Sequence, residues 1–132
     1  VAAAGRFKIG LNEVQVGLPV PQTILLAFER LVGSHRAAVL ATQGSLIGPD
    51  EALATGLVDE LVDADQVVAQ AIARAEALAA LPPIAMNQTR LQSKAAFVSA
   101  LQGTRDAEVA TDYWFSEETQ QAMHALVESL RK

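Results

Sequence analysis

Glycine and proline residues divide this chain into short segments, and their positions limit the length of the helices and strands that the chain can form. Gly33, Gly44, Gly56, Gly103 and the pair Pro82-Pro83 each follow a stretch with apolar residues, mostly at helical spacing, and both residue types stop helices. The pattern predicts helices over residues 23–32, 37–42, 49–56, 64–80 and 84–101 and from 116 to the C-terminus. No run is long enough to span a membrane.

Particular residues mark three of the predicted helix starts. Ser34 and Ser116 are suited to the N-cap position, where a side-chain oxygen accepts a hydrogen bond from a backbone amide. Pro49 suits the first helical position, because its missing amide hydrogen is not needed there. Glu117 and Glu118 follow Ser116 and suit the positive end of the helix dipole.

Two short strands are expected, at residues 7–10 and 57–62. Short strands are not stable without partners. We therefore expect residues 7–10 to pair with a segment that this chain does not contain. The chain reads as a mostly helical part of an α/β fold with two or three short strands.

Composition excludes several classes of function. The net charge is -5, so no basic surface is available for nucleic acid. There is no cysteine, which rules out disulfides, thiolate catalysis and cysteine–zinc sites. The two histidines lie far apart in sequence without ligands at metal spacing, so no metal site is expected. The N-terminus has no signal-peptide pattern, which makes a cytoplasmic location the default expectation.

Glu13 is the strongest candidate for chemistry. It lies in a short apolar stretch between Gly10 and Gly17. A carboxylate among apolar neighbours is costly to ionise, so it is suited both to take up and to release a proton. The alternative is a glutamate at the end of a strand or loop that points into water, as charged residues usually do.

The order of these features resembles the enoyl-CoA hydratase/isomerase (crotonase) family. The resemblance rests on three collinear segments: residues 7–18 around Glu13, residues 45–62, and the tail from 105 to 132. It implies an α/β fold, namely the C-terminal part of a crotonase-like fold. Within it, residues 1–62 would be the end of the core with the catalytic-glutamate loop. Residues 63–132 would be a helical region for oligomerisation or for covering the active site.

The resemblance implies a catalytic role for Glu13. It falls where the family's hydratases carry one of two catalytic glutamates and its Δ3,Δ2-enoyl-CoA isomerases carry their single one. The glycine-rich turn that supplies the oxyanion hole would lie upstream of Val1. Leu11-Asn12-Glu13 and residues 18–25 look closer to the isomerase pattern. We expect a 3-enoyl-CoA isomerase of fatty acid metabolism. The alternatives are an enoyl-CoA hydratase, which is a lyase, and a non-catalytic crotonase-like binding or assembly module.

The resemblance also suggests residues that bind the substrate. Asn12 and Leu18 would lie near the acyl group, and Trp114 would cover its pocket; Arg131 and Lys132 would meet the phosphates of coenzyme A. Each has a plainer alternative: Asn12 as a turn residue, Trp114 in a packing cluster, and the terminal cations at a helix C-terminus. No cofactor is expected beyond the coenzyme A thioester of the substrate itself.

The expected partners follow from the same resemblance. They are an acyl-CoA substrate and further copies of the chain, as a homotrimer or a dimer of trimers, without nucleic acid or membrane. A free-standing helical domain is a third possibility, which the short strands make unattractive.

Overall fold

The computed structural model describes residues 1–104 and 106–131. Within these residues the strands are β1 Ala2–Ala3, β2 Ile9–Gly10, β3 Leu46–Ile47 and β4 Leu61–Val62. The helical elements are the 3₁₀ turn η1 Glu13–Val16 and the helices α1 Gln22–Val32, α2 Ser34–Gln43, α3 Pro49–Ala54, α4 Val67–Ala79, α5 Pro83–Leu101, α6 Asp106–Trp114 and α7 Glu117–Leu130. The chain is therefore mostly helical, as the sequence predicts.

The predicted helices are present, and their ends follow the expected residues. Pro49 and Pro83 each occupy an early position of their helix. The hydroxyl of Ser116 accepts a hydrogen bond from the amide of Thr119 at 3.2 Å, which confirms the predicted N-cap of α7. Helix α6 was not predicted, because its segment is rich in Asp, Thr, Tyr and Trp, which have modest helix propensity.

Gly33, and not Ser34, lies between the first two helices as their shared cap. Its amide donates to the carbonyl of Glu29 at 2.9 Å, and its own carbonyl accepts from the amide of Ala37 at 3.0 Å. Its φ of 83° with a ψ of 150° is a conformation that only glycine adopts easily. Ser34 is consequently the first residue of α2, and the predicted cap was wrong by one position.

Each strand finds a partner within the chain. β1 pairs with β4 in parallel, with Ala2 opposite Leu61, and β2 pairs with β3 in antiparallel, with Ile9 opposite Ile47. The expectation that residues 7–10 lack a partner here was wrong. β3 is only two residues long, so its sequence carries too little alternation to be recognised as a strand.

The strand predicted at residues 57–62 is shorter than expected. Only Leu61 and Val62 are extended and paired. The amides of Leu57 and Val58 both donate to the carbonyl of Ala52, at 2.9 and 3.2 Å. These bonds fold the start of the segment back onto the end of α3 and remove it from the sheet.

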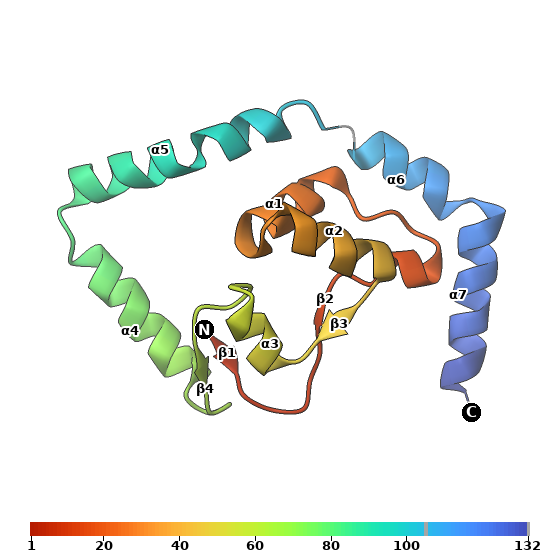
Figure 1. Ribbon diagram of the computed structural model, residues 1–132, viewed down its shortest axis with the longest axis horizontal. Helices are drawn as coiled ribbons and strands as arrows, with labels where there is room; N and C mark the ends of the chain where they lie inside the picture. Colours follow the sequence, from red (N-terminus) through yellow and green to blue (C-terminus); the bar gives the residue numbers. More distant parts are fainter. Residues whose placement is uncertain (105, 132) are drawn as a thin grey trace.

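The hydrophobic core lies where α1, α2, α3 and β3 meet. Its buried members are Phe28, Ala37, Leu40, Ile47 and Ala52. Ala37 and Ala52 are fully buried, so the small side chains of these helices allow them to pack closely around Phe28. Figure 1 shows this group of elements in orange and yellow at the centre of the molecule, with η1 at its edge.

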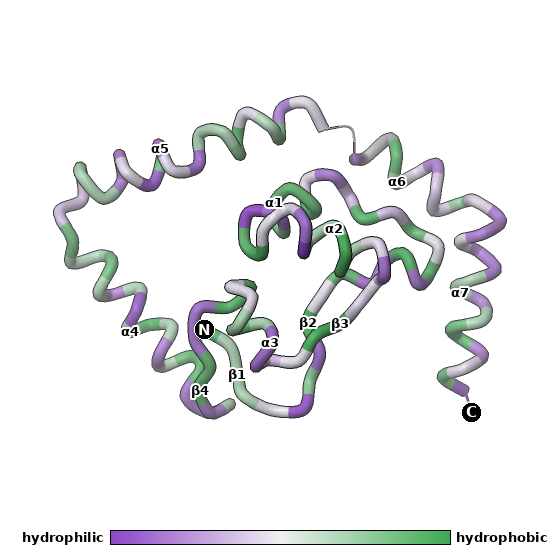
Figure 2. Tube along the Cα trace, viewed as in Figure 1, coloured by the Kyte–Doolittle hydropathy of each residue, from purple (hydrophilic) through white to green (hydrophobic). Residues whose placement is uncertain are grey.

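Helices α4 to α7 form an open arc around the core in Figure 1. Neither α4 nor α5 contains a buried residue. Their apolar residues recur along both helices in Figure 2, yet Val68 is 70% exposed and Ile84 is 87% exposed. Close packing of helices is therefore limited to the helices of the core.

Polar contacts attach α4 and α5 to the core. Glu60 accepts a hydrogen bond from Gln70 Nε2 at 2.8 Å and pairs with Arg74 Nε at 2.7 Å, which holds α4 beside β4. On α1, the guanidinium of Arg30 donates to the carbonyl of Ser93 on α5 at 2.7 Å. Among the described residues no single helix has both the length and the hydropathy to cross a bilayer; α4 and α5 have them only in combination, as a pair bent by 109°.

Candidate active site

Glu13 begins η1, a tight turn between β2 and α1. The amide of Gln15 donates to the carbonyl of Asn12 at 3.0 Å, and the amide of Leu18 donates to the carbonyl of Glu13 at 3.1 Å. Gly17 ends the turn with a φ of 77°, in the left-handed region that glycine tolerates best. The local sequence therefore favours a closed turn of fixed shape around the carboxylate.

The Glu13 carboxylate has an oxygen that no described group satisfies. The residue is half-buried, and its Oε2 is buried with no hydrogen-bond donor among the residues that the structure describes. Leaving a buried carboxylate oxygen without a donor is unfavourable, and such groups call for an explanation beyond stability. A buried acceptor with free lone pairs is suited to take a proton from a bound molecule.

Helix α2 supports the turn on one side. Gln15 Nε2 donates to the carbonyl of Gly44, the C-cap of α2, at 2.8 Å. A Cβ on Gly44 would lie 2.8 Å from Gln15 Cγ and 2.9 Å from Val14 Cγ2. The absence of a side chain at Gly44 therefore lets η1 pack directly on the end of α2.

Helix α7 supports the same turn on another side. The hydroxyl of Thr119, in its first turn, donates to the carbonyl of Gly17 at 2.8 Å. Thr119 is fully buried, and a Cβ on Gly17 would lie 2.9 Å from its Cα. Two residues 102 positions apart are thus in direct contact, and α7 is fastened to the loop that carries Glu13.

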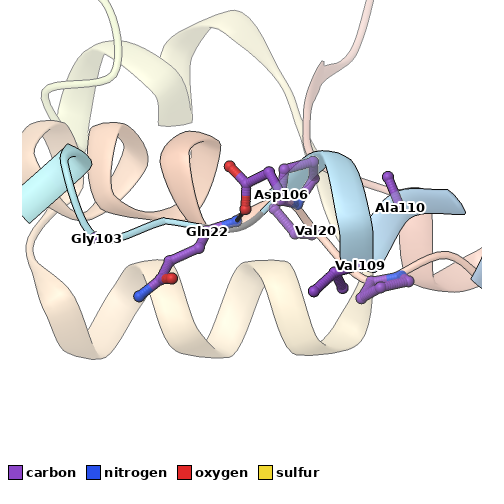
Figure 3. A pocket seen from close by; sticks show the side chains of 8 residues that line it. Val20, Gln22, Gly103, Asp106, Val109 and Ala110 are labelled. Atoms are coloured by element: carbon purple, nitrogen blue, oxygen red, sulfur yellow. Dashed lines mark hydrogen bonds between the residues drawn. The ribbon is translucent and has the colours of Figure 1, made fainter. Parts of the chain in front are cut away.

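A hollow of about 340 Å³ lies directly after this loop, between the segment leading into α1 and the start of α6. Its lining residues are Pro19, Val20, Pro21, Gln22, Gly103, Asp106, Val109 and Ala110. Figure 3 shows the Asp106 carboxylate next to Gln22 at the start of α1, while Val109 and Ala110 come from α6. The lining is mostly apolar, which suits an apolar rather than a charged group.

Asp106 provides the cap that α1 lacks in its own sequence. Pro21 precedes α1 and makes no side-chain cap. Asp106 accepts from the amide of Gln22 at 2.7 Å and from the amide of Thr23 at 2.9 Å, and it also accepts from the Thr23 hydroxyl. Hydrogen bonds from Thr23, first from its hydroxyl, hold the pKa of the Asp106 carboxyl below its usual 3.8.

The predicted site residues fall into separate groups. Asn12, Glu13 and Leu18 lie together on the turn; Asn12 is exposed and Leu18 is half-buried. Trp114 ends α6, 45% exposed, and lines a shallow hollow of about 280 Å³ with Phe115 and two other residues.

Arg131 follows α7 and is exposed. About 12 helical residues separate it from Thr119, which corresponds to roughly 18 Å along the axis. The structure therefore does not bring it to the Glu13 turn. Lys132 lies outside the described residues. Within the described ranges there is no group of three or more His, Asp or Glu that could hold a metal ion.

Sequence reasoning missed Thr119 and Asp106. Thr119 stands three residues after the N-cap Ser116, a position that commonly interacts with the cap. That spacing could have marked it as a capping residue, but no local signal indicates a contact with Gly17. Asp106 follows Gly103 at a plausible helix start, and nothing near it in sequence indicates that it caps a different helix.

Comparison with known proteins adds an independent finding. The sequence profile of the family described as Enoyl-CoA hydratase/isomerase matches residues 1–132. The chain is 39% identical over 105 residues to human enoyl-CoA delta isomerase 1, mitochondrial, covering 79% of this chain and 34% of that protein. It is 31% identical to the rat protein of the same name over 135 residues, covering 100% of this chain and 46% of the relative.

Solved structures share the fold. The crystal structure of human mitochondrial delta3-delta2-enoyl-CoA isomerase matches with a TM-score of 0.84 at 30% identity, covering 99% of this chain and 52% of the other. An enoyl-CoA hydratase/isomerase from Pseudoalteromonas atlantica matches with a TM-score of 0.86 at 24% identity, covering 98% and 53%. The predicted fold class, a part of the crotonase-like α/β fold, is confirmed. The chain spans between a third and a half of the length of these curated relatives.

Proposed function

Since the chain belongs to the enoyl-CoA hydratase/isomerase family, whose profile matches residues 1–132, we propose that the protein moves the double bond of a 3-enoyl-CoA to the 2 position, with Glu13 as the proton carrier. The observation that carries this proposal is the buried Oε2 of Glu13, which has no donor among the described residues. A carboxylate oxygen that no described group occupies is free to receive a proton from the substrate.

The proposed reaction needs one base that reaches two carbons. The Glu13 carboxylate removes a proton from C2 of the substrate, and the electron pair is delocalised over the C3–C4 double bond and the thioester oxygen. The protonated Glu13 then returns the proton to C4, and the double bond forms between C2 and C3. No atom is gained or lost, so a single carboxylate lying over C2 and C4 suffices.

The charge that develops on the thioester oxygen needs its own stabilisation. Backbone amide donors preorganised at that oxygen are the usual solution and are worth several kcal/mol, about 3 for one donor. We place these donors in the part of the fold that the relatives have beyond the length covered by this chain. The activity is accordingly proposed for the full-length gene product.

Support for an isomerase over a hydratase comes from the relatives. The human and rat proteins are named delta isomerases, and the human isomerase structure shares 30% identity with this chain. Leu11-Asn12-Glu13 agrees with that preference. A hydratase would use a second glutamate and would add water. The names of these relatives also assign them to mitochondria, so the cytoplasmic location expected for this chain stays a prediction.

Substrate contacts are part of the same proposal. Asn12 and Leu18 flank Glu13 on the turn, where the reacting part of the acyl chain would lie, and Trp114 would cover a more distant part of it. Arg131, with Lys132 beyond the described residues, is proposed to meet coenzyme A phosphates, and its distance along α7 from the turn suits the far end of a long ligand.

The exposed apolar faces of α4 and α5 favour an assembly role for the second half of the chain. Val68, Ile72 and Ile84 are all more than half exposed, and exposed apolar surface of this kind is typical of interfaces. We propose residues 1–62 as the core with the catalytic loop and 63–132 as the oligomerisation or lid region, in a homotrimer or a dimer of trimers. A non-catalytic assembly module is the second candidate function.

The test is Glu13→Gln in the full-length protein, with Glu76→Gln on the exposed face of α4 as the matched control. We expect the kcat for conversion of 3-enoyl-CoA to 2-enoyl-CoA to fall by about 10²- to 10⁴-fold in the first variant and to stay unchanged in the second. Hydration of 2-enoyl-CoA, measured in parallel, separates an isomerase from a hydratase. Unchanged turnover in Glu13→Gln would contradict the role of Glu13 and favour the assembly module.

A further inference from the structure

Thr119, near the C-terminal end of the sequence, contacts the loop that carries Glu13. We propose that it is a positioning residue for the Glu13 carboxylate, an inference that rests on the proposed function. It acts through the peptide group that joins Gly17 to Leu18. The Thr119 hydroxyl donates to Gly17 O at 2.8 Å, and the amide of Leu18 donates to Glu13 O at 3.1 Å. The acceptor of the first bond and the donor of the second belong to the same peptide group.

A single planar group therefore connects the two residues. In a trans peptide the carbonyl and the amide hydrogen point in opposite directions, so fixing one fixes the other; the structure contains no cis peptide bond in the described residues. Hydrogen bonds in a chain also polarise one another, so a donor to Gly17 O strengthens the bond that Leu18 makes to Glu13. Loss of the Thr119 hydroxyl would remove the first hydrogen bond and weaken the second.

Thr119 is itself held in a defined orientation. The Ser116 hydroxyl donates to Thr119 Oγ1 at 3.0 Å and accepts from the Thr119 amide at 3.2 Å. The Thr119 hydroxyl hydrogen is thus directed to Gly17, and its backbone fills the space that a side chain at Gly17 would occupy. The residue is fully buried, so water does not replace this contact readily.

The Glu13 side chain depends on this support because little else holds it. Its Oε2 has no donor among the described residues, so the position of the carboxylate follows from the backbone of η1. Gln15 fixes one side of that turn to Gly44 of α2, and Thr119 fixes its end to α7. A proton carrier that must reach two carbons has a small tolerance for displacement, and a shift of about 1 Å can lower a rate by about 10²-fold.

The experiment compares two substitutions of Thr119 in the full-length protein. Thr119→Val keeps the branched shape and removes the hydroxyl, while Thr119→Ser keeps the hydroxyl. The matched control is Thr55→Val, because the Thr55 hydroxyl also donates to a backbone carbonyl, that of Ala52 at 3.2 Å, away from the turn. Kinetic constants for 3-enoyl-CoA are measured at equal folded protein concentration, and exchange of the Leu18 amide hydrogen is followed by NMR.

We expect Thr119→Val to lower kcat by about tenfold or more, with KM changed by less than about twofold. Thr119→Ser should restore most of the rate, Thr55→Val should leave it unchanged, and the Leu18 amide should exchange faster only in Thr119→Val. If Glu13→Gln abolishes turnover while Thr119→Val loses no more than Thr55→Val, the positioning role is overturned and the proposed function stands. If Glu13→Gln keeps full turnover, the proposed function fails. Separately, an unchanged exchange rate of the Leu18 amide in Thr119→Val would show that Thr119 does not fix the turn and would overturn the positioning role.

Discussion

The carboxylate of Asp106 accepts hydrogen bonds from both the backbone amide and the hydroxyl of Thr23, a residue 83 positions earlier in the chain. Through this contact α6 caps the N-terminus of α1 and closes one side of the hollow that follows the Glu13 turn. An anionic group at this position also interacts favourably with the positive end of the α1 dipole. One side chain thus joins the C-terminal helices to the core.

Replacing Asp106 by Asn should destabilise the fold in a pH-dependent way. Hydrogen bonds from Thr23 and Gln22 hold the pKa of this carboxyl below 3.8 in the folded state. A lowered pKa in the folded state means that the ionised form is stabilised by folding. This stabilisation is complete above the unfolded pKa and is lost as the pH falls through the folded pKa.

The measurement is urea unfolding of wild type and Asp106→Asn between pH 7 and pH 2.5. The difference in unfolding midpoint should be largest at neutral pH and should shrink below about pH 4, where the unfolded carboxyl becomes protonated. Asp112→Asn, on the exposed face of the same helix, is the control and should show little difference at any pH. A difference for Asp106→Asn that is constant over this range would contradict the role of its charge.

Replacing Gly17 by Ala should detach α7 from the turn that carries Glu13. The new Cβ would lie 2.9 Å from Thr119 Cα, and the φ of 77° is unfavourable for alanine. The backbone strain alone is worth about 1–2 kcal/mol, and overpacking against a backbone atom adds typically about 1–3 kcal/mol. We expect a clear loss of stability and a change in the fluorescence of Trp114, the single tryptophan, which lies just before α7.

Gly33→Ala is the control that separates the effect of backbone strain from the effect of a steric clash. Gly33 also has a positive φ, of 83°, but no atom lies within 4 Å of where its Cβ would be. This variant should lose stability through strain and leave the emission of Trp114 unchanged. Equal fluorescence changes in the two variants would mean that Trp114 does not report the contact between Thr119 and Gly17.

Core and outer-helix substitutions should differ in how they depend on assembly. Phe28→Ala removes the largest buried side chain of the core and should cost about 3–5 kcal/mol at any protein concentration. Ile84→Ala, at an 87% exposed position of α5, should change stability by less than about 0.5 kcal/mol in a monomer. Unfolding in urea at several protein concentrations measures both.

If the loss in free energy of unfolding caused by Ile84→Ala grows with protein concentration, α5 is covered by another subunit, as proposed for residues 63–132. A cost as large as that of Phe28→Ala at every concentration would contradict the exposure of this face. The comparison thereby tests the proposed division of the chain as well as its core.

The helices could be predicted because their limits are local. Gly44, Pro49 and the Pro82-Pro83 pair restrict the backbone wherever they occur, so they fix helix ends without information from distant residues. The strand pairs could not be predicted, because β3 is two residues long and pairs with a distant segment: Leu46 lies opposite Gly10 of β2, 36 positions earlier. Pairing of such short strands is decided by the packing of Ile9 and Ile47 in and around the core.

The candidate site was predictable only in part, because some of its contacts join residues that are far apart in the sequence. Glu13 stands out because a carboxylate in an apolar stretch is conspicuous in the sequence itself. Thr119 and Asp106 are ordinary residues at helix starts, and their contacts with Gly17 and Thr23 come from the folding of the C-terminal helices over the core. Tertiary contacts of single polar side chains leave no periodic signal for sequence reasoning to use.

The contact between Gly44 and Gln15 makes the number of residues in α2 a requirement of the candidate site. Adding one residue to α2 would rotate its last carbonyl by about 100° and move it by about 1.5 Å along the axis. The Gly44 carbonyl would then point away from Gln15, and the support of η1 on that side would be lost. Helix α2 must therefore keep its length even where its outer face is free to vary.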